Sequence, residues 1–284
     1  MVGRQEPVAS DDRHFRPIFD GVALTGWRAV PRHNAPRIPG DPWPSRDTEE
    51  WRRAEAHTGK WTVEEGAIVG RQDPPGIGLG AYLVSEEMFA DFELVFEARP
   101  DWPADTGIMV RATDIGSQGF QILLDHRKSG NIGGFYGNGI GGFHAIAFTV
   151  DLRRDAAGSP VGLMIEDPAT SLEQLTPDKP ALLAHAATGA AFLAAWKWGE
   201  WNEFRITVEG AKPRITTTVN GVLIAVLDGA SLKHPHYDAD RVAGLLGRRG
   251  HIAFEMHDND PAMGEARWGR TAACRWRNIR LREL

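Results

Sequence analysis

Short segments in which apolar and polar residues alternate recur along this chain, and they limit the folds available to it. In FELVFEAR, the apolar residues Phe92, Leu94 and Phe96 share one face of an extended strand. The same period-two pattern occurs in FQILLD (residues 120–125) and in HIAFEMHD (residues 251–258). No long amphipathic helix separates these segments, which argues against an alternating strand–helix fold. We therefore expect an all-β sandwich of two packed antiparallel sheets.

Turn signals between the strands support this prediction. WTVEEGAIVG predicts a hairpin that turns at Glu65-Gly66. PRITTTVNGVLIAVLDG predicts another that turns at Asn220-Gly221, because Asn-Gly is among the strongest short-range hairpin signals.

The predicted domain organisation is simple. We expect a flexible N-terminus at residues 1–14 and a single domain at residues 15–284. Two stretches lack the strand pattern and are expected to be insertions, at about residues 31–57 and 151–195. The first predicts a short helix over TEEWRRAEAH, capped by Asp47, and the second predicts one or two short helices over the sandwich.

Charge and composition exclude several classes of protein. The net charge is −6 with both signs interspersed, which argues against a nucleic-acid or anionic-membrane surface. No run of 18 apolar residues is present, so we expect no membrane span. The N-terminus lacks the apolar region of a secretory signal, and Cys274, the single cysteine, allows no intrachain disulfide. We expect a cytoplasmic protein, and the oligomeric state stays open.

A glycine-rich stretch follows the strand FQILLD and is a candidate ligand-binding loop. Seven glycines lie between Gly130 and Gly142, and backbone without side chains can approach a ligand closely. Tyr136, Asn138 and His144 lie among or beside these glycines, and we expect them to bind substrate. A tight connection without a ligand is the alternative. A G-x-G-x-x-G match inside the stretch lacks the strand–helix context of a dinucleotide site.

Residues that point away from the predicted core are chemically reactive in type. They come from several strands and would meet only if those strands are neighbours on one concave sheet. An ordinary solvated face is the alternative reading. The members of this outward set are Glu97, Arg111, Gln121, Asp125, Glu255 and His257.

Tryptophan is abundant, with ten residues against three tyrosines. Its broad ring could form the floor of a sugar subsite or fill the core of a large sandwich. The candidates for a sugar floor are Trp102, Trp196, Trp198 and Trp201.

Several segments together resemble the 3-keto-disaccharide hydrolase domain family, which was once known only as a domain of unknown function. The resemblance covers most of residues 15–284 outside the two insertions. Asp105-Thr106 stands where that family usually has Asn-Ser, and F-Q-I-L-L-D replaces a commoner Tyr-Glu-Val-Gln-Ile-Leu-Asp. The matching segments are FRPIFDGVALTGW, KWTVEEGAIVG, LVSEEMFADFELVFEAR, DTGIMVR, LDHRKSGNIGGFYG, GEWNEFRITVEG with NGV in the next hairpin, and RNIRLREL.

This resemblance implies a concanavalin A-like jelly-roll sandwich with a sugar site on its concave face. It also implies action on glycosides whose ring carries a ketone at C3. Such a ketone acidifies the hydrogen on C2, so that a base can remove it and the enolate can expel the C1 substituent. Water can then add across the new double bond. This chemistry needs a base, an acid and a positive group at the enolate oxygen.

The candidate catalytic residues are expected to lie together under the glycine-rich stretch. Asp125, His126, Glu255 and His257 could supply a base, an acid or ligands for a divalent cation such as Ca²⁺, although their spacing matches no standard metal motif. Arg111 could face the carbonyl oxygen. Gln121, Glu97 and Trp102 are further candidates for binding the carbohydrate substrate.

Two other functions stay open. A carbohydrate-binding module could keep the cleft and lack the chemistry. A conventional glycoside hydrolase or polysaccharide lyase could use the same fold, but related jelly-roll glucanases carry E-x-D-x-E on one strand, and no such triplet occurs here.

Overall fold

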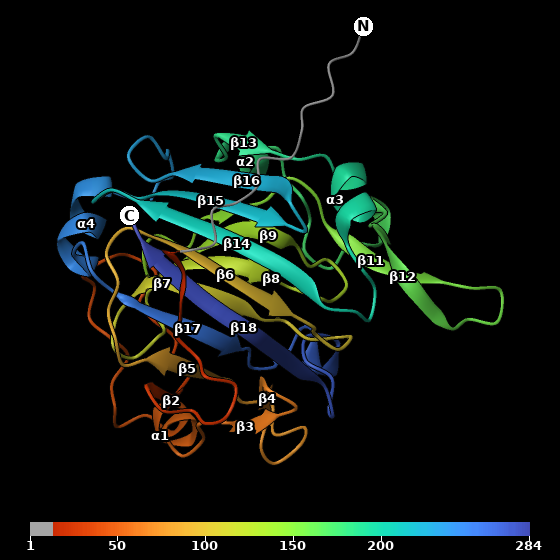
Figure 1. Ribbon diagram of the computed structural model, residues 1–284, viewed down its shortest axis with the longest axis horizontal. Helices are drawn as coiled ribbons and strands as arrows, with labels where there is room; N and C mark the ends of the chain where they lie inside the picture. Colours follow the sequence, from red (N-terminus) through yellow and green to blue (C-terminus); the bar gives the residue numbers. More distant parts are fainter. Residues whose placement is uncertain (1–13) are drawn as a thin grey trace, which may run out of the picture.

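The computed structural model describes residues 14–284 as two large antiparallel sheets packed face to face (Figure 1). Most of the predicted N-terminal segment, residues 1–13, lies outside the described residues. This architecture confirms the predicted jelly-roll β-sandwich with short helical insertions. Among residues 14–284, the helices are all too short or too polar to cross a membrane.

The nine-stranded sheet carries both hairpins that were predicted from turn signals. Glu65 and Gly66 have φ angles of 50° and 75°, and Asn220 and Gly221 have φ angles of 48° and 79°, as two-residue hairpin turns require. In spatial order this sheet contains β13 (His185–Ala186), β16 (Val222–Asp228), β15 (Arg214–Val219), β14 (Asn202–Glu209), β6 (Phe92–Ala98), β18 (Ala273–Glu283), β4 (Ala67–Arg71) and β3 (Lys60–Glu64), and β1 (Arg16–Pro17) pairs with β18.

The seven-stranded sheet carries the glycine-rich stretch. Its strands are, in spatial order, β10 (His144–Ala145), β9 (Ile132–Asn138), β8 (Gly119–Leu124), β7 (Gly107–Ala112), β17 (His251–Met256), β5 (Ala81–Ser85) and β2 (Trp27–Pro31).

The core lies between the two sheets and is built from the inward residues of each strand. Phe96 on β6 stacks on Phe204 of β14, with ring centroids 5.2 Å apart. Phe96 also meets Phe254 of β17 at 6.0 Å, which joins the two sheets, and Phe254 packs on Trp276 at 4.9 Å. These rings are buried, and removal of their apolar surface from water is the main force holding the sheets together.

Shorter elements lie outside the two large sheets, most of them within the two stretches expected to be insertions, residues 31–57 and 151–195. The first contains α1 (Glu49–Glu55), but Thr48 rather than Asp47 caps it, because the Thr48 hydroxyl accepts from the Trp51 amide at 3.1 Å. The other elements are a hairpin that was not predicted, β11 (Val150–Arg154) and β12 (Pro160–Ile165), with η2 (Pro168–Thr170), α2 (Asp178–Ala181), α3 (Gly189–Ala195), α4 (Ala239–Leu246) and η3 (Gly264–Ala266).

Candidate active site

A buried glutamate marks the floor of the candidate site on the outer face of the seven-stranded sheet. Glu255 on β17 is 0% exposed. The hydroxyl of Tyr82, directly opposite on β5, donates to it at 3.0 Å, and the amide of Gln121 on β8 also donates. Arg32 Nε donates at 2.9 Å, which neutralises the buried charge.

A polar pocket of about 300 Å³ opens beside this floor. Most of the residues predicted from strand parity and from the glycine-rich stretch line it. The predicted residues that line this pocket, which we call the catalytic pocket after its proposed role, are Gln121, Asp125, Tyr136, Asn138, His144 and His257.

Two carboxyl groups meet in the pocket and share a hydrogen bond. Asp105 and Asp125 are 2% and 4% exposed. Asp105 accepts from Arg127 Nε at 2.6 Å and also from Arg267. Among the described residues, Asp125 Oδ1 has no hydrogen-bond partner.

The pair is asymmetric in charge. Burial acts to raise the pKa of Asp105, but the positive charges of Arg127 and Arg267 hold that pKa well below its usual range. Burial and the neighbouring Asp105 carboxylate raise the pKa of Asp125 well above its usual range. The pair therefore holds one proton, on Asp125, and Asp125 donates it to Asp105.

An imidazole lies at the edge of the same pocket. His257 Nδ1 is 3.0 Å from the Asp258 carboxylate and 2.7 Å from the Asp258 carbonyl oxygen. Arg32 Nη2 lies 2.9 Å from His257 Nε2, and a guanidinium can only donate. The neutral ring therefore carries its proton on Nδ1 and presents a lone pair on Nε2.

The pKa of His257 reflects competing neighbours. Burial and the Arg32 charge act to lower it, whereas the carboxylates of Asp105 and Asp258 raise it, and the net direction is upward. Protonation of Nε2 would break the contact with Arg32, so the observed geometry belongs to the neutral ring.

The rim of the pocket comes from the second insertion and from β10. Glu173 accepts from Arg127 at 2.7 Å and from Arg267 at 3.0 Å. Burial and the charge of Lys179 lower the pKa of His144 to about 4, so its ring is neutral at pH 7. The His144 ring meets that of Tyr136 edge to face at 5.9 Å, because the two residues are paired across β9 and β10.

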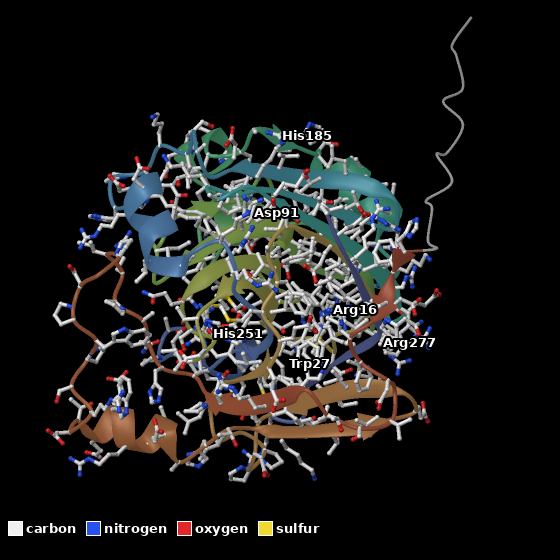
Figure 2. The ribbon with its side chains drawn as sticks, turned by 60° about the vertical axis from the view of Figure 1, so that its left-hand side comes forward. Arg16, Trp27, Asp91, His185, His251 and Arg277 are labelled. Atoms are coloured by element: carbon white, nitrogen blue, oxygen red, sulfur yellow. The ribbon has the colours of Figure 1, made fainter. Side chains whose placement is uncertain are left out.

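Arg111 does not lie beside this site, contrary to the prediction from parity. Its φ is 51°, and the pairing of β7 with β17 shifts register between His251 and Ala253, so a β-bulge interrupts the alternation. The Arg111 side chain instead donates to Asp91 at 2.7 Å and to the Gly210 carbonyl at 3.2 Å (Asp91 and His251 are marked in Figure 2).

His126 also faces away from the pocket. An antiparallel bridge between Ala104 and His126 continues the alternation past the end of β8, so His126 points opposite to Asp125. Its Nδ1 donates to the Asp101 carbonyl at 2.8 Å, and burial lowers its pKa to about 4. Trp102, predicted to bind sugar, packs on His126 with centroids 5.2 Å apart, beside Trp196 and Trp198.

Glu97 lies on the other sheet altogether. It accepts from Arg277 Nε at 2.8 Å and from Asn278 on the outer face of the nine-stranded sheet (Arg277 is marked in Figure 2). The parity prediction that Glu97 points outward is correct, but that outer face is not the one that carries the pocket.

Sequence reasoning missed several charged residues of the site. Asp105 and Arg127 carry a readable signal, because they extend the outward parity of Gly107 on β7 and of Asp125 after β8. Arg32, Arg267 and Glu173 come from irregular segments, where no periodicity points to a face. Asp258 lies in the irregular segment directly after β17, where the strand periodicity has ended.

A divalent cation does not fit this set of donors. The carboxylates of Asp105, Glu255 and Asp258 already accept from guanidinium groups, and Asp125 holds a proton. Across residues 14–284, no three His, Cys, Asp or Glu side chains are arranged to hold a metal ion.

Comparisons with known proteins identify one matching family. A family model described as a 3-keto-alpha-glucoside-1,2-lyase-like domain matches residues 14–282. No curated protein matches the chain.

Solved structures share a low level of similarity with this chain. One from Parabacteroides distasonis, provisionally assigned to the glycosyl hydrolases, is 13% identical, covers 99% of this chain and 100% of its own, and has a TM-score of 0.49. The carbohydrate-binding module CBM66 of Bacillus subtilis is 11% identical, with 79% and 92% covered and a TM-score of 0.43. The β-glucanase of Bacillus licheniformis is 10% identical, with 95% and 97% covered and a TM-score of 0.43.

Proposed function

Because the chain belongs to the 3-keto-alpha-glucoside-1,2-lyase-like domain family, we propose that its catalytic pocket cleaves glycosides whose sugar ring carries a ketone at C3. The family is the one that the sequence segments resemble, and a carbohydrate-active role follows from membership. The proposed reaction removes the C2 proton and eliminates the C1 substituent, and water then adds to the product.

The shared proton of Asp105 and Asp125 is the observation that carries this proposal. Elimination from C1 needs a neutral acid that can protonate the departing oxygen. Burial beside the ionised Asp105 keeps Asp125 protonated at a pH where an ordinary aspartate is ionised. Asp125 lines the pocket and is the proposed acid.

His257 is the proposed base. Its Nε2 lone pair can take the C2 proton once substrate displaces Arg32, while Asp258 holds the Nδ1 proton and fixes the tautomer. The electron pair of the C2–H bond passes to the C3 oxygen as an enolate. Arg32, Arg127 and Arg267 line the pocket and can stabilise that negative charge.

Collapse of the enolate then breaks the C1–O bond. The electron pair returns from the C3 oxygen, a C1–C2 double bond forms, and the departing oxygen takes the proton of Asp125. Addition of water reverses the proton movements. The hydroxyl of the water bonds to C1 and its remaining proton goes to the Asp125 carboxylate, while the protonated His257 gives its proton to C2. Both side chains are thereby restored.

The geometry of the Asp105–Asp125 pair does not match the carboxyl pair of a conventional glycoside hydrolase. Such enzymes hold two carboxyl groups roughly 5–5.5 Å apart for retention and about 6.5–9.5 Å apart for inversion, with the sugar between them. Asp105 and Asp125 are hydrogen-bonded to each other, so no anomeric carbon fits between them. A carbohydrate-binding module needs no general acid, so a proton shared by two buried carboxyl groups is not expected in one.

The test compares one glycoside before and after oxidation at C3 by a sugar dehydrogenase. Release of the leaving group only from the oxidised form supports the proposal. Release from both forms would indicate a conventional hydrolase or lyase. Calorimetric binding without release from either form would indicate a carbohydrate-binding module.

A further inference from the structure

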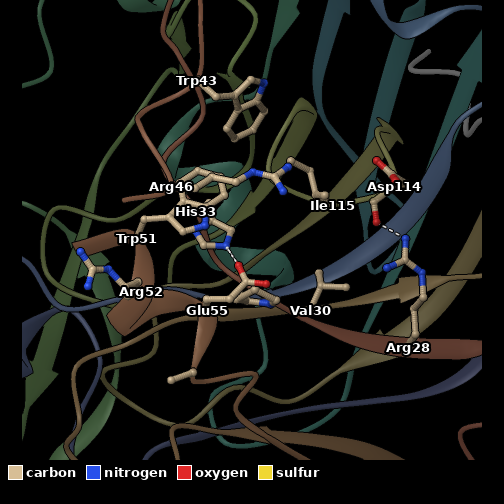
Figure 3. A pocket seen from close by; sticks show the side chains of 12 residues that line it. Arg28, Val30, His33, Trp43, Arg46, Trp51, Arg52, Glu55, Asp114 and Ile115 are labelled. Atoms are coloured by element: carbon tan, nitrogen blue, oxygen red, sulfur yellow. Dashed lines mark hydrogen bonds and ion pairs between the residues drawn. The ribbon is translucent and has the colours of Figure 1, made fainter. Parts of the chain in front are cut away.

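A second and larger cavity lies on the same face of the seven-stranded sheet, at its β2 edge. Its volume is about 950 Å³, at the upper end of the range for small-molecule sites. Its walls come from β2, α1 and the turn after β7, and we call it the helix pocket (Figure 3). Residues 32–37 separate it from the catalytic pocket, since Arg32 and Asn34 line the catalytic pocket and His33 lines the helix pocket.

Aromatic rings in fixed positions form one wall of the helix pocket. The Trp51 ring stacks on the buried ring of His33, with centroids 3.7 Å apart and planes 10° apart. His33 Nε2 is held by Glu55 at 2.6 Å, and Trp43 meets Trp51 edge to face at 6.3 Å (Figure 3). These contacts preorganise the indoles before any ligand binds.

The floor of the helix pocket is apolar. It is formed by Val30 and Pro31 of β2 and by Ile115 in the turn after β7. An apolar floor under an indole favours a flat ligand, because a flat ring can remove apolar surface from water on both of its sides.

Positive charge in the helix pocket is only partly used. Arg28 and Arg52 each donate to a backbone carbonyl, of Asp114 and Asp47 respectively. The Arg46 guanidinium lies 5.7 Å from the Trp51 ring and has no carboxylate partner among the described residues. Figure 3 shows the Arg46 side chain extending across the cavity toward Ile115.

The acidic groups of the helix pocket do not neutralise these arginines. Glu55 is engaged by His33, and Asp114 is exposed on the turn. Free guanidinium N–H groups bind a carboxylate through charge-assisted, often bidentate, hydrogen bonds.

We propose that the helix pocket binds a planar aromatic carboxylate. The ring lies against Trp43 and the apolar floor, and the carboxylate accepts from Arg46. Most of the aromatic and charged wall comes from residues 33–55, which lie outside the strands of the catalytic pocket's sheet. The site is independent of the sugar chemistry of the catalytic pocket.

The test titrates the full chain with 4-hydroxybenzoate and measures binding by calorimetry and by tryptophan fluorescence. We expect saturable binding with one ligand per chain and a change in indole emission from Trp43 or Trp51. Arg46→Ala should weaken binding at least tenfold. Ile115→Trp, which fills the cavity and removes no charge, should abolish binding.

Matched controls separate this site from the rest of the surface. Arg249→Ala is the control for Arg46→Ala. It removes an exposed arginine that does not line the helix pocket, and it should leave binding unchanged. Asp125→Asn in the catalytic pocket should also leave it unchanged. Absence of binding by the wild-type chain would overturn the proposal. Equal binding of benzyl alcohol, or binding that survives both helix-pocket variants, would also overturn it.

Discussion

Asp105 and Asp125 are identical side chains in one pocket, and their neighbours give them different charges. Two guanidinium groups contact Asp105, whereas Asp125 is buried against a carboxylate. A neighbouring carboxylate raises the pKa of a carboxyl group, and a neighbouring arginine lowers that pKa. The difference in protonation is therefore a property of position and not of residue type.

Asp125→Asn tests the proposed acid directly. The amide has the same shape but cannot give up a proton at neutral pH, so kcat for a 3-keto glycoside should fall by roughly 10²–10⁴-fold. The melting temperature should change little because the substitution is isosteric. Glu97→Gln makes the same kind of change on the nine-stranded sheet and should leave kcat unchanged. Near wild-type turnover by Asp125→Asn would exclude its role as the acid.

The pH dependence of kcat/KM should be bell-shaped. His257 acts as a base only when it is neutral, and its pKa is raised, so activity should be lost as pH falls through a midpoint above 6.5. Asp125 acts only when it is protonated, and its pKa is also raised, so activity should be lost again at higher pH. A rate profile measured across pH 5–10 checks both limbs. A profile that is flat below pH 7 would contradict the role of His257.

At the scale of single elements, the glycine-rich stretch is first of all a packing device. A methyl group on Gly130 would overlap the Asp125 carbonyl oxygen, and one on Gly137 would overlap the Phe143 ring. The chain passes so closely here that side chains are excluded, whether or not a ligand is bound. The same close passage holds Tyr136 and Asn138 at the pocket.

Gly130→Ala is therefore expected to displace Asp125 and to lower both stability and activity. Urea unfolding should show a loss of more than about 1 kcal/mol, the usual cost of forcing an extra carbon atom into a packed site. Gly158→Ala is the control, since Gly158 sits at φ +83° in the β11–β12 turn with nothing within 4 Å. It should lose only about 1 kcal/mol and no activity. Equal effects of both variants would contradict the packing role.

The bulge in β7 gives Arg111 a structural role. Its guanidinium is buried and pairs with Asp91, which also accepts from Arg248, a residue whose side chain is 64% exposed. Asp91→Ala should lower the free energy of unfolding by about 3 kcal/mol, because it leaves a buried charge unpaired. Arg248→Ala removes only the exposed partner and should cost less than about 1 kcal/mol. Chemical denaturation of both variants measures the difference, and similar losses would contradict this assignment.

At the scale of the whole molecule, the catalytic pocket is completed by segments far from its floor in sequence. Arg32 comes from the first insertion and contacts Glu255, His257 and Asp258. Glu173 comes from the second insertion and joins Arg127 to Arg267. Both insertions therefore contribute side chains to the site.

Arg32→Ala should move the acid limb of the pH profile upward. The Arg32 charge lowers the pKa of His257, so its removal should raise that pKa and demand a higher pH for activity. Arg37→Ala removes an exposed arginine from the same segment, residues 32–37, and should leave the limb in place. A downward shift in Arg32→Ala would contradict the proposed electrostatics.

The sequence by itself determined the sandwich, the two hairpins that turn at Glu65-Gly66 and Asn220-Gly221, and the pocket-facing residues that follow a regular strand. Alternation has a period of two, so Gln121, Asp125 and Glu255 could be placed on the outer face without knowing which strands are neighbours. Tertiary structure alone decided which outer face carries the pocket, and it moved Glu97 away from the site. It also decided where alternation breaks, at the bulge of Arg111, and where it continues, at His126. Arg32, Arg267 and Glu173 belong to irregular segments, whose direction is set by long-range contacts that no local pattern records.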